Sequence, residues 1–539
     1  MYSRHNARGI HTVWPRYSLA GAFHFVAMAG VRMPYDADLI VVGSGAGGAT
    51  VAYACAQAGK RILLLERGRR HPPIVSALTP DMRGQRLDHD EQATLIDKAP
   101  YDDRRVQVNG VGRRLYMGGV VGGSTALYGA ALMRPARDDF HPGRSYGNRL
   151  PRALWDWPIA YEALEPFYTE AERLFGVSAS RDDDFGLLPG PRGSSSNIAP
   201  LHPINQRLVA ANRSQGLRPF RLPLAIDFDR CLQCSVCPGY LCPTGARRSA
   251  AHLLESPEMR RETVLCDTEA ERLCLDGKGN PDGIEAVQRS TGKRTVYRAP
   301  RYVLAAGAIG TPLLLLRSGV DHPLLGRNYM MHYSPVAVGI FARRTGAETA
   351  FIKQVGFSDY YFGAKGFAHK MGIVQSLPVP GPLMLAKAAS RKLPRFLLEF
   401  LRSRMLPLVG IIEDLPDPCN RVSWGADGLP HLQHRFARFD LERGKELARL
   451  TAQILKRAGA AFCLTSGFAS EEHVAHQCGT VRFGYDPRSA VLDADCRLFQ
   501  HPNVFVADGS FMPTSLGVGP ALTIIANALR VGRVVAREA

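Results

Sequence analysis

The chain has 539 residues, of which 45% are hydrophobic and 22% are charged. These are the values of an ordinary globular protein, so they exclude a wholly disordered, collagenous or coiled-coil chain, and the length predicts two domains or more. Lys and Arg total 67 against 49 Asp and Glu, which gives a formal net charge of +18. Because no Lys/Arg block carries interleaved aromatic residues, we expect no nucleic-acid partner.

The N-terminal segment differs from the rest of the chain. Residues 1–32 contain no Asp or Glu, and a short apolar stretch at 19–29 faintly resembles a signal peptide, although His24 interrupts it. Met33 stands just before the first predicted strand. We therefore predict that residues 1–35 form an extension outside the folded domains.

Cysteine usage and hydropathy bear on the compartment. The chain has 11 cysteines, an odd number with scattered single residues, which favours a reducing environment. No apolar run is long enough to span a bilayer. We expect a cytoplasmic protein, with a periplasmic or a membrane-peripheral location as the alternatives.

The first predicted elements form one strand–helix–strand unit. Residues 38–42 are a continuous apolar run, typical of a strand buried on both faces of a parallel sheet. An Ala-rich helix follows the Gly-rich turn and ends before Gly59, and residues 61–65 form the next apolar strand. This βαβ unit has the size expected of a mononucleotide-binding half.

The turn inside this unit carries the pattern of a dinucleotide-binding loop. Gly43 permits a tight turn, Gly45 lets the backbone approach a pyrophosphate, and Gly48 lets the helix pack closely on the strand. The helix beginning at Ala46 offers free N–H groups to phosphates. Glu66, at the end of the second strand, is placed to accept ribose hydroxyls, which favours FAD or NAD over NADP.

The remaining segments predict a discontinuous domain. Further elements are expected as an acidic amphipathic helix within 155–176, buried strands at 302–307 and 503–507, and a helix over 520–536. The α/β pieces at the two ends of the chain predict one Rossmann-type domain, assigned to residues 36–150, 225–330 and 475–539. Strand-like alternation in the middle predicts an inserted substrate-binding domain with an antiparallel sheet, assigned to residues 151–224 and 331–474. The fold class is therefore α/β, with an α+β character overall.

Four further segments make the chain from residue 36 onward resemble the GMC (glucose–methanol–choline) oxidoreductases. They are Gly122-Gly123-Ser124-Thr125 with Arg134 downstream, residues 307–319, residues 476–480 (HQCGT), and residues 508–523. Trp157-Pro158-Ile159 and a cysteine cluster ending in residues 242–246 place the resemblance near the bacterial branch of sugar and gluconate dehydrogenase large subunits.

The resemblance implies a cofactor and a set of binding residues. FAD is the expected cofactor, and its binding residues are expected to be Gly43, Gly45, Ala46, Gly48, Glu66, Gly122, Gly123, Ser124, Thr125, Asp508, Gly509 and Pro520. The N-terminus of the last helix, opened by Gly519-Pro520, would face the flavin and stabilise negative charge on the reduced ring. Tyr128 stands where many relatives have Asn or His near the flavin.

The resemblance also implies the chemistry. A hydride would pass from the carbinol carbon of an alcohol to flavin N5 while His476 removes the hydroxyl proton. Most relatives have Asn or His where this chain has Gly519, and that side chain binds the substrate oxygen. Either Ser515 or His473 replaces it, or the freed space admits a larger substrate.

The cysteines Cys231, Cys234, Cys237 and Cys242 have nearly the spacing of a bacterial ferredoxin, with the last interval one residue longer. They suit an iron–sulfur cluster or zinc, and the alternatives are reduced structural thiols or a local disulfide. A cluster would favour a dehydrogenase, because electrons would then have an exit other than oxygen.

The basic, Leu-rich stretch 383–412 suits contact with a membrane surface, a lid over a lipophilic substrate, or an ordinary amphipathic packing face. Pro394 and Pro407 limit it to short helices.

These observations lead to one favoured function. We expect an FAD-dependent dehydrogenase that oxidises a CH–OH group of a sugar, an aminosugar or another polyol and passes electrons to a non-oxygen acceptor, with a redox partner or small subunit as a further candidate partner. The alternatives are an oxidase that uses O₂, or a lyase, decarboxylase or isomerase on the same scaffold, since fold alone does not fix function.

Overall fold

The computed structural model describes residues 35–70, 100–180, 182–234, 237–388, 393–468 and 475–539. The predicted N-terminal extension therefore lies, except for its last residue, outside the described residues. Residues 35–539 form one unit by their internal contacts.

A parallel sheet organises the dinucleotide-binding part. Its strand order is β18-β10-β1-β2-β6, and all neighbours are parallel. The strands are β1 (Leu39–Val42), β2 (Ile62–Leu65), β6 (Thr263–Leu265), β10 (Arg301–Leu304) and β18 (Val504–Val506). β1 and β2 are buried along their whole length, as the continuous apolar runs predicted.

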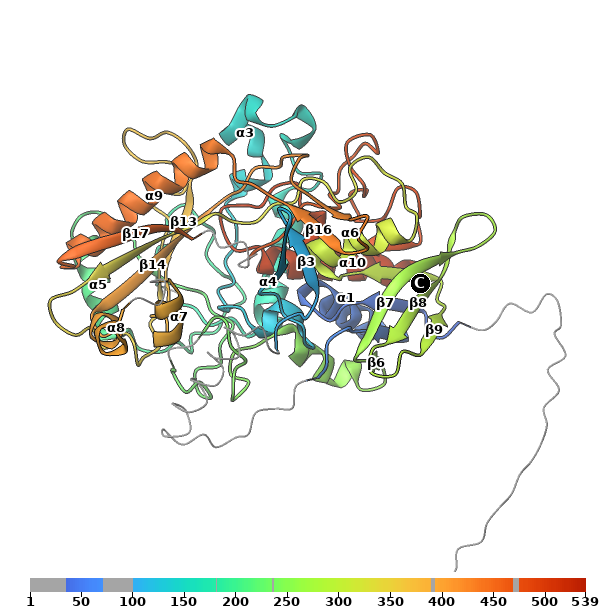
Figure 1. The fold of residues 1–539 in the computed structure, drawn as a ribbon, viewed down its shortest axis with the longest axis horizontal. Coiled ribbons are helices and arrows are strands. Elements are labelled where there is room, and N and C mark those ends of the chain that lie inside the picture. The colour runs from blue at the N-terminus through green and yellow to red at the C-terminus, as the bar shows by residue number, and fades with distance from the viewer. Residues whose placement is uncertain (1–34, 71–99, 181, 235–236, 389–392, 469–474) are drawn as a thin grey trace, which may run out of the picture. The chain divides into compact units, whose positions relative to one another are not determined.

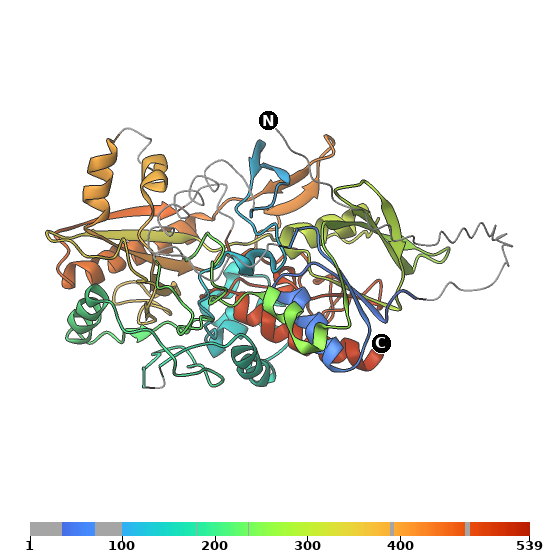
Figure 2. The same cartoon turned by 90° about the horizontal axis from the view of Figure 1, so that it is seen from below.

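Helices pack beside this sheet. Helix α1 (Ala46–Gln57) connects β1 to β2 and packs against α10 (Ala521–Glu538), which also contacts α4 (Tyr161–Leu174). Figure 2 shows α1 and α10 side by side near the C-terminus. Gly532 permits close contact, because a Cβ there would lie 2.8 Å from the Cβ of Ala54.

The second large sheet has six antiparallel strands and lies on the left in Figure 1. Its order is β17-β11-β14-β13-β12-β5, with strands β5 (Phe220–Arg221), β11 (Ser334–Ile340), β12 (Val355–Phe357), β13 (Gly372–Ser376), β14 (Met405–Ile412) and β17 (Phe462–Phe468). Helix α9 (Arg438–Arg457) packs on β11, β14 and β17. This is the predicted antiparallel sheet of the central segment.

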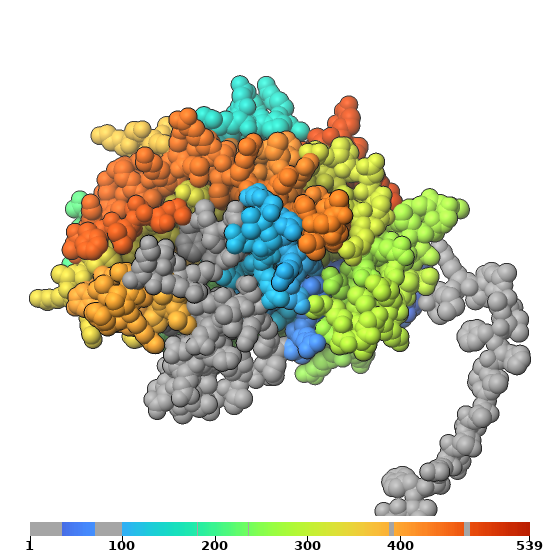
Figure 3. Space-filling model, in the orientation of Figure 1, coloured from blue at the N-terminus to red at the C-terminus, as the bar shows by residue number. Residues whose placement is uncertain are grey.

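Two smaller sheets complete the fold. One has the order β15-β16-β3-β4, and the other β7-β8-β9. On the face shown in Figure 3, the blue residues of β3 and β4 lie beside the orange residues of β15 and β16. The strands are β3 (Arg105–Val108), β4 (Val111–Arg114), β7 (Thr268–Leu275), β8 (Pro281–Gln288), β9 (Arg294–Tyr297), β15 (Arg421–Trp424) and β16 (Pro430–Gln433). The remaining α-helices are α3 (Pro142–Tyr146), α5 (Pro203–Arg213), α6 (Gly307–Arg317), α7 (Pro382–Ala388) and α8 (Arg395–Arg402).

Short 3₁₀ helices occupy several turns: η1 (Gly123–Ala126), η2 (Arg137–Phe140), η3 (Gly147–Arg149), η4 (Arg152–Leu154), η5 (Ala250–Glu255), η6 (Pro257–Met259) and η7 (Gly509–Phe511). Among the described residues, no helix is both long and apolar enough to cross a membrane.

The fold class is confirmed, and the domain boundaries stay a prediction. Two segments that the prediction places in the substrate-binding domain contact the other domain: α4 packs on α10, and β16 pairs with β3. The expectation that 383–412 forms short helices is wrong for residues 405–412. Residues 405–412 form β14, which is buried throughout between β11 and β13, because its Leu, Val and Ile residues occupy the core of the sheet. Only α7 and α8 remain of the surface stretch.

Candidate active site

A cavity of about 1210 Å³ lies between the two large sheets. One wall is made by the loops at the carboxyl ends of β1, β2, β10 and β18, where ligands bind in open α/β sheets. The other includes Val336, Gln375, Val409 and Ile411 from the antiparallel sheet. The volume exceeds the roughly 300–1,000 Å³ of an ordinary ligand pocket, so it has room for a dinucleotide and a second ligand.

The glycines of the first loop fit a bound dinucleotide. A Cβ on Gly43 would lie 2.4 Å from the carbonyl oxygen of Ala305, and one on Gly48 would lie 1.9 Å from that of Gly43. A Cβ on Gly45 would meet no atom within 4 Å. Gly43 and Gly48 are thus needed for packing inside the protein, whereas Gly45 leaves open space in the cavity at the N-terminus of α1, where a phosphate is stabilised.

Glu66 joins the two Gly-rich segments. Its buried carboxylate accepts hydrogen bonds from the backbone N–H and the hydroxyl of Ser44, at 2.8 and 2.6 Å, and from the N–H of Gly68. The Ser44 hydroxyl in turn accepts the N–H of Gly122 at 2.9 Å. Burial raises the pKa of Glu66. Glu66 lines the cavity, where it could meet a ligand. Its contact with a ribose stays a prediction.

The other predicted cofactor residues also surround the cavity. Those that line it are Gly43, Gly45, Ala46, Glu66, Gly123, Ser124, Thr125, Asp508, Gly509 and Pro520, and the predicted catalytic position Gly519 lines it as well. Gly48 and Gly122 act one layer behind, through the contacts described above. Thr125 also has a structural role, since its hydroxyl donates to the carbonyl of Gly122 and accepts the N–H of Ala250.

Asp508 fastens the C-terminal motif to the turn after β10. One carboxylate oxygen accepts the N–H of Gly307 at 2.8 Å and the hydroxyl of Thr311 at 2.5 Å. The other accepts the N–H and hydroxyl of Ser510. All four donors belong to the protein, so this side chain shapes the cavity wall.

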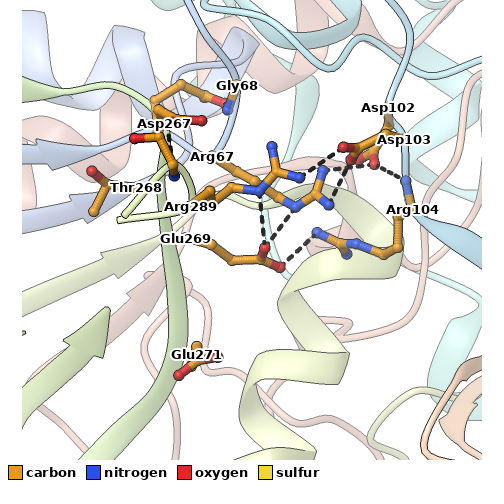
Figure 4. Close-up of polar contacts among 12 residues, drawn as sticks. Arg67, Gly68, Asp102, Asp103, Arg104, Asp267, Thr268, Glu269, Glu271 and Arg289 are labelled. Atoms are coloured by element: carbon orange, nitrogen blue, oxygen red, sulfur yellow. Dashed lines mark hydrogen bonds and ion pairs between the residues drawn. The ribbon is translucent and has the colours of Figure 1, made fainter. Parts of the chain in front are cut away.

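A cluster of ion pairs holds the cavity wall next to Glu66 (Figure 4). The guanidinium of Arg67 lies 2.8 Å from both Asp102 and Asp103 and 2.9 Å from Glu269. Arg289 also pairs with Asp103 at 2.7 Å. Although partial burial opposes it, the Arg289 hydrogen bond and the charge of Arg67 lower the pKa of Asp103 to about 2. The cluster joins β2, β7 and the segment before β3.

The predicted base, His476, lies against a second histidine that the sequence did not single out. Met330 and Cys478 exchange two backbone hydrogen bonds of 3.0 Å, as an isolated antiparallel bridge. His332 lies two residues after Met330, and His476 lies two residues before Cys478, so the antiparallel bridge places the two histidines opposite each other. Their Nδ1 atoms are 2.8 Å apart. His476 has a backbone φ of +63°, a left-handed conformation that is uncommon outside glycine and recurs at functional sites.

The hydrogen bonds assign the proton positions. Burial lowers the pKa of His332 to about 4, so its ring is neutral at pH 7. Its Nε2 lies 2.8 Å from the carbonyl oxygen of Leu516, which can only accept, so Nε2 carries the proton. His332 Nδ1 therefore accepts from Nδ1–H of His476, which leaves a lone pair on Nε2 of His476. Burial, together with the neighbouring His332 and the charge of Lys353, holds the pKa of His476 well below its usual value.

The lone pair of His476 lies at the position of the missing side chain. A Cβ on Gly519 would lie 3.4 Å from Nε2 of His476, so a larger residue there would contact the base. The hydroxyl of Ser515, one candidate replacement, accepts the N–H of Asp414 and donates to its carbonyl, so its proton is used inside the protein. The other candidate, His473, lies outside the described residues.

The four predicted metal-ligating cysteines lie together at the border of the cavity. Cys231, Cys234, Cys237 and Cys242 surround one hollow of about 20 Å³, and Cys234 also lines the large cavity. Among the described residues, no three His, Cys, Asp or Glu side chains have an arrangement that could hold a metal ion. Burial raises the pKa of Cys231 to about 12 and raises that of Cys237. Although burial opposes it, the backbone N–H and the charge of Arg247 lower the pKa of Cys242.

Two residues escaped the sequence analysis. His332 follows Met330-Met331 in no pattern that marks a site, and its role depends on a bridge between distant segments. Lys353 interrupts an apolar run before β12, which is a weak signal, because isolated charges in such runs usually face solvent.

The fold and the cavity together are those of a dinucleotide-binding oxidoreductase, with the predicted base His476 in the cavity wall. Two family models, both described as GMC oxidoreductase, match residues 37–334 and 419–528. The chain belongs to the GMC oxidoreductase family, whose members act on CH–OH donors, and FAD is its cofactor.

Known relatives agree with this assignment. The chain is 30% identical to the 6'''-hydroxyparomomycin C oxidase of Streptomyces lividus, over 93% of this chain and 91% of the relative. It is 26% identical to the fructose dehydrogenase large subunit of Gluconobacter japonicus, over 92% and 97%. Pyridoxine 4-oxidase from Mesorbium loti has the same fold, with a TM-score of 0.63 and 20% identity over 93% of this chain and 99% of that one. The predicted likeness to bacterial sugar dehydrogenases is confirmed.

Replacing His332 tests the proton assignment. His332→Leu should lower kcat/KM for alcohol oxidation by about 10- to 100-fold, the usual cost of losing a partner that orients an active-site histidine. His332→Gln should recover most of that loss, because a side-chain carbonyl can accept Nδ1–H of His476. Steady-state kinetics of both variants, with the flavin content of each preparation measured, checks the expectation. Equal activity of the two variants would show that the hydrogen bond does not matter.

Proposed function

We propose that the protein is an FAD-dependent dehydrogenase that oxidises a CH–OH group of a sugar, an aminosugar or another polyol and delivers the electrons to a non-oxygen acceptor. The observation that carries the proposal is the unprotonated Nε2 of His476, which lies beside Gly519 in the cavity that also holds the dinucleotide loop. The names of the relatives include both an oxidase and a dehydrogenase.

The residues act in a simple order. The cavity orients the alcohol so that its hydroxyl donates to Nε2 of His476, which takes the proton as the carbinol carbon loses a hydride. His332 holds His476 in the reactive tautomer and accepts from its Nδ1–H throughout. Bound FAD supplies the hydride acceptor. The absence of a side chain at Gly519 widens the space next to the base, which suits a ring-bearing substrate better than a small alcohol.

The cysteine cluster carries no step of this proposal, since its described thiols do not form a metal-binding set. An iron–sulfur cluster there would supply an electron exit, and a redox partner or small subunit would then dock nearby.

Anaerobic spectroscopy tests the proposal. The purified protein should show flavin absorbance that bleaches when a sugar or polyol is added without oxygen, and the reduced protein should react faster with a quinone dye than with O₂. Stoichiometric peroxide would instead identify an oxidase. Turnover without bleaching would indicate lyase or isomerase chemistry and overturn the proposal. A broad visible shoulder that dithionite removes would reveal an iron–sulfur cluster, and clean flavin bands would exclude one.

A further inference from the structure

A buried lysine in the wall of the cavity, close enough to His476 to affect its pKa, lacks a charged partner. Lys353 is 3% exposed and lines the cavity, as does Gln375, which is 8% exposed. Nζ of Lys353 donates to Oε1 of Gln375 at 3.0 Å. Within the described part of the chain, that is its only hydrogen bond, and no carboxylate lies within ion-pair distance of Nζ. Buried ammonium groups are normally paired, so two N–H donors here await an acceptor.

The surrounding backbone makes room for this side chain. A Cβ on Gly129 would lie 2.6 Å from Cε of Lys353 and 3.3 Å from its Nζ. Gly129 follows Tyr128 in the wall of the cavity. The ammonium group is therefore packed into place between β13 and the segment after η1, and it cannot extend into solvent as surface lysines do.

Most acidic side chains that line the cavity have partners other than Lys353, and none is paired with it among the described residues. Asp102 and Glu269 pair with Arg67, and Asp508 accepts four protein donors. Glu399, on α8, lies 3.4 Å from Arg402. Glu348 also lines the cavity but makes no ion pair with Lys353 among the described residues. The charge of Lys353 is thus not cancelled by the protein.

Two groups close to Lys353 do not supply the missing charge. Cys237 interacts with it electrostatically, but burial raises the pKa of that thiol, so the thiol is neutral. His476 is a neutral base whose pKa the lysine lowers. Burial without a carboxylate lowers the pKa of Lys353 itself to about 8, which leaves it mainly protonated at neutral pH.

We propose that Lys353 and Gln375 form an anion-binding subsite in the cavity, and that the substrate is a hydroxyl compound bearing a carboxylate, such as a sugar acid. Nζ of Lys353 and Nε2 of Gln375, whose Oε1 is already used by the lysine, are two neighbouring donors for the two carboxylate oxygens. The same charge opposes a cationic aminosugar. The substrate class rests on the proposed alcohol oxidation, whereas the anion-binding subsite does not.

A binding experiment isolates the subsite from catalysis. Cyclohexanecarboxylate and its uncharged amide have no oxidisable hydroxyl, so calorimetric titration of the FAD-loaded protein with each measures binding alone. The carboxylate should bind about 10-fold or more tightly than the amide, as expected of a charge-assisted hydrogen bond in a buried site. Lys353→Met should abolish this preference, and Lys353→Arg should keep most of it.

Gln375→Glu is the matched control. It replaces the amide nitrogen of the side chain by an oxygen and so places a carboxylate next to Lys353. The resulting internal ion pair should remove the preference for the ligand carboxylate although the lysine is still present. This variant keeps the outcome readable if Lys353→Met is too unstable to purify. Equal binding of the acid and the amide by the natural protein, or a preference that survives both substitutions, would overturn the proposal.

Kinetics then tests the substrate class. The ratio of kcat/KM for D-glucuronate to that for D-glucose should exceed 1 and fall by about 10-fold in Lys353→Met, with D-glucosamine the poorest of the three. A natural protein that prefers D-glucosamine would contradict the substrate class. If no compound bleaches the flavin, the oxidation proposed above fails, while the calorimetric result still decides the anion site.

Discussion

Replacing His476 with Asn is expected to lower kcat/KM for alcohol oxidation by about 10²- to 10⁴-fold, the usual contribution of a general base. Asn is chosen because it tolerates the left-handed backbone at this position, where φ is +63°, so the loop should keep its shape. The variant should retain flavin, because His476 faces the part of the cavity expected to hold the substrate. None of the glycines in the dinucleotide-binding loop contacts its side chain. Steady-state rates and the visible spectrum of the purified variant check both points. Activity within a few-fold of the natural protein would exclude His476 as the base.

The same residue predicts the pH dependence. A base works when unprotonated, so a lowered pKa keeps it active at pH values below the usual pKa of histidine. His332 and Lys353 both lower the pKa of His476, in addition to burial. We expect the acidic limb of kcat/KM that reports protonation of His476 to lie below the usual pKa of histidine, so activity should not fall near that pKa as the pH is lowered. In Lys353→Met, one repulsive charge is gone, so the acidic limb should move to higher pH.

Replacing Gly45 with Asp is expected to yield protein without flavin. The Cβ itself would meet no protein atom within 4 Å, so the fold should tolerate the change. The carboxylate would occupy the space in front of the N-terminus of α1 and repel the pyrophosphate that this space receives. Flavin absorbance per protein after purification is the measurement.

Gly277→Asp provides the matched control for that experiment. Gly277 is exposed between β7 and β8, and a Cβ there also meets nothing within 4 Å. The control adds the same charge and should bind flavin normally. Full flavin content in Gly45→Asp would mean that the cofactor does not approach this loop.

The dinucleotide loop could be predicted from the sequence because its determinants are local. Gly48 must be small because of the carbonyl of Gly43 within the same βαβ unit, and apolar runs indicate the neighbouring strands. The close neighbour of Gly43 is Ala305, after the distant β10, but the glycine spacing itself is a local pattern. The stretch 405–412 could not be assigned in the same way. Its apolar residues suit a membrane-facing helix or a core strand equally well, and pairing with the distant β11 and β13 decides between them.

The substrate side of the site was harder to predict for the same reason. His332 becomes functional only because the 330–478 bridge aligns two segments far apart in the chain. Lys353 is unusual only because its surroundings lack a carboxylate, a property of the packed structure. In both cases the residue type is common, and the long-range contact carries the information.

The four hydrogen bonds that Asp508 accepts also determine when, during synthesis of the chain, the cofactor site can form. The turn after β10 relies on a carboxylate near the C-terminus, and β10 has β18 as its outer neighbour in the sheet. While residues 503–539 are still inside the ribosome, the emerging chain has neither this fastening nor α10 beside α1. Flavin incorporation therefore has to wait until residues 503–539 have emerged and folded, and a message cut short before this segment would produce a colourless protein whatever the supply of cofactor.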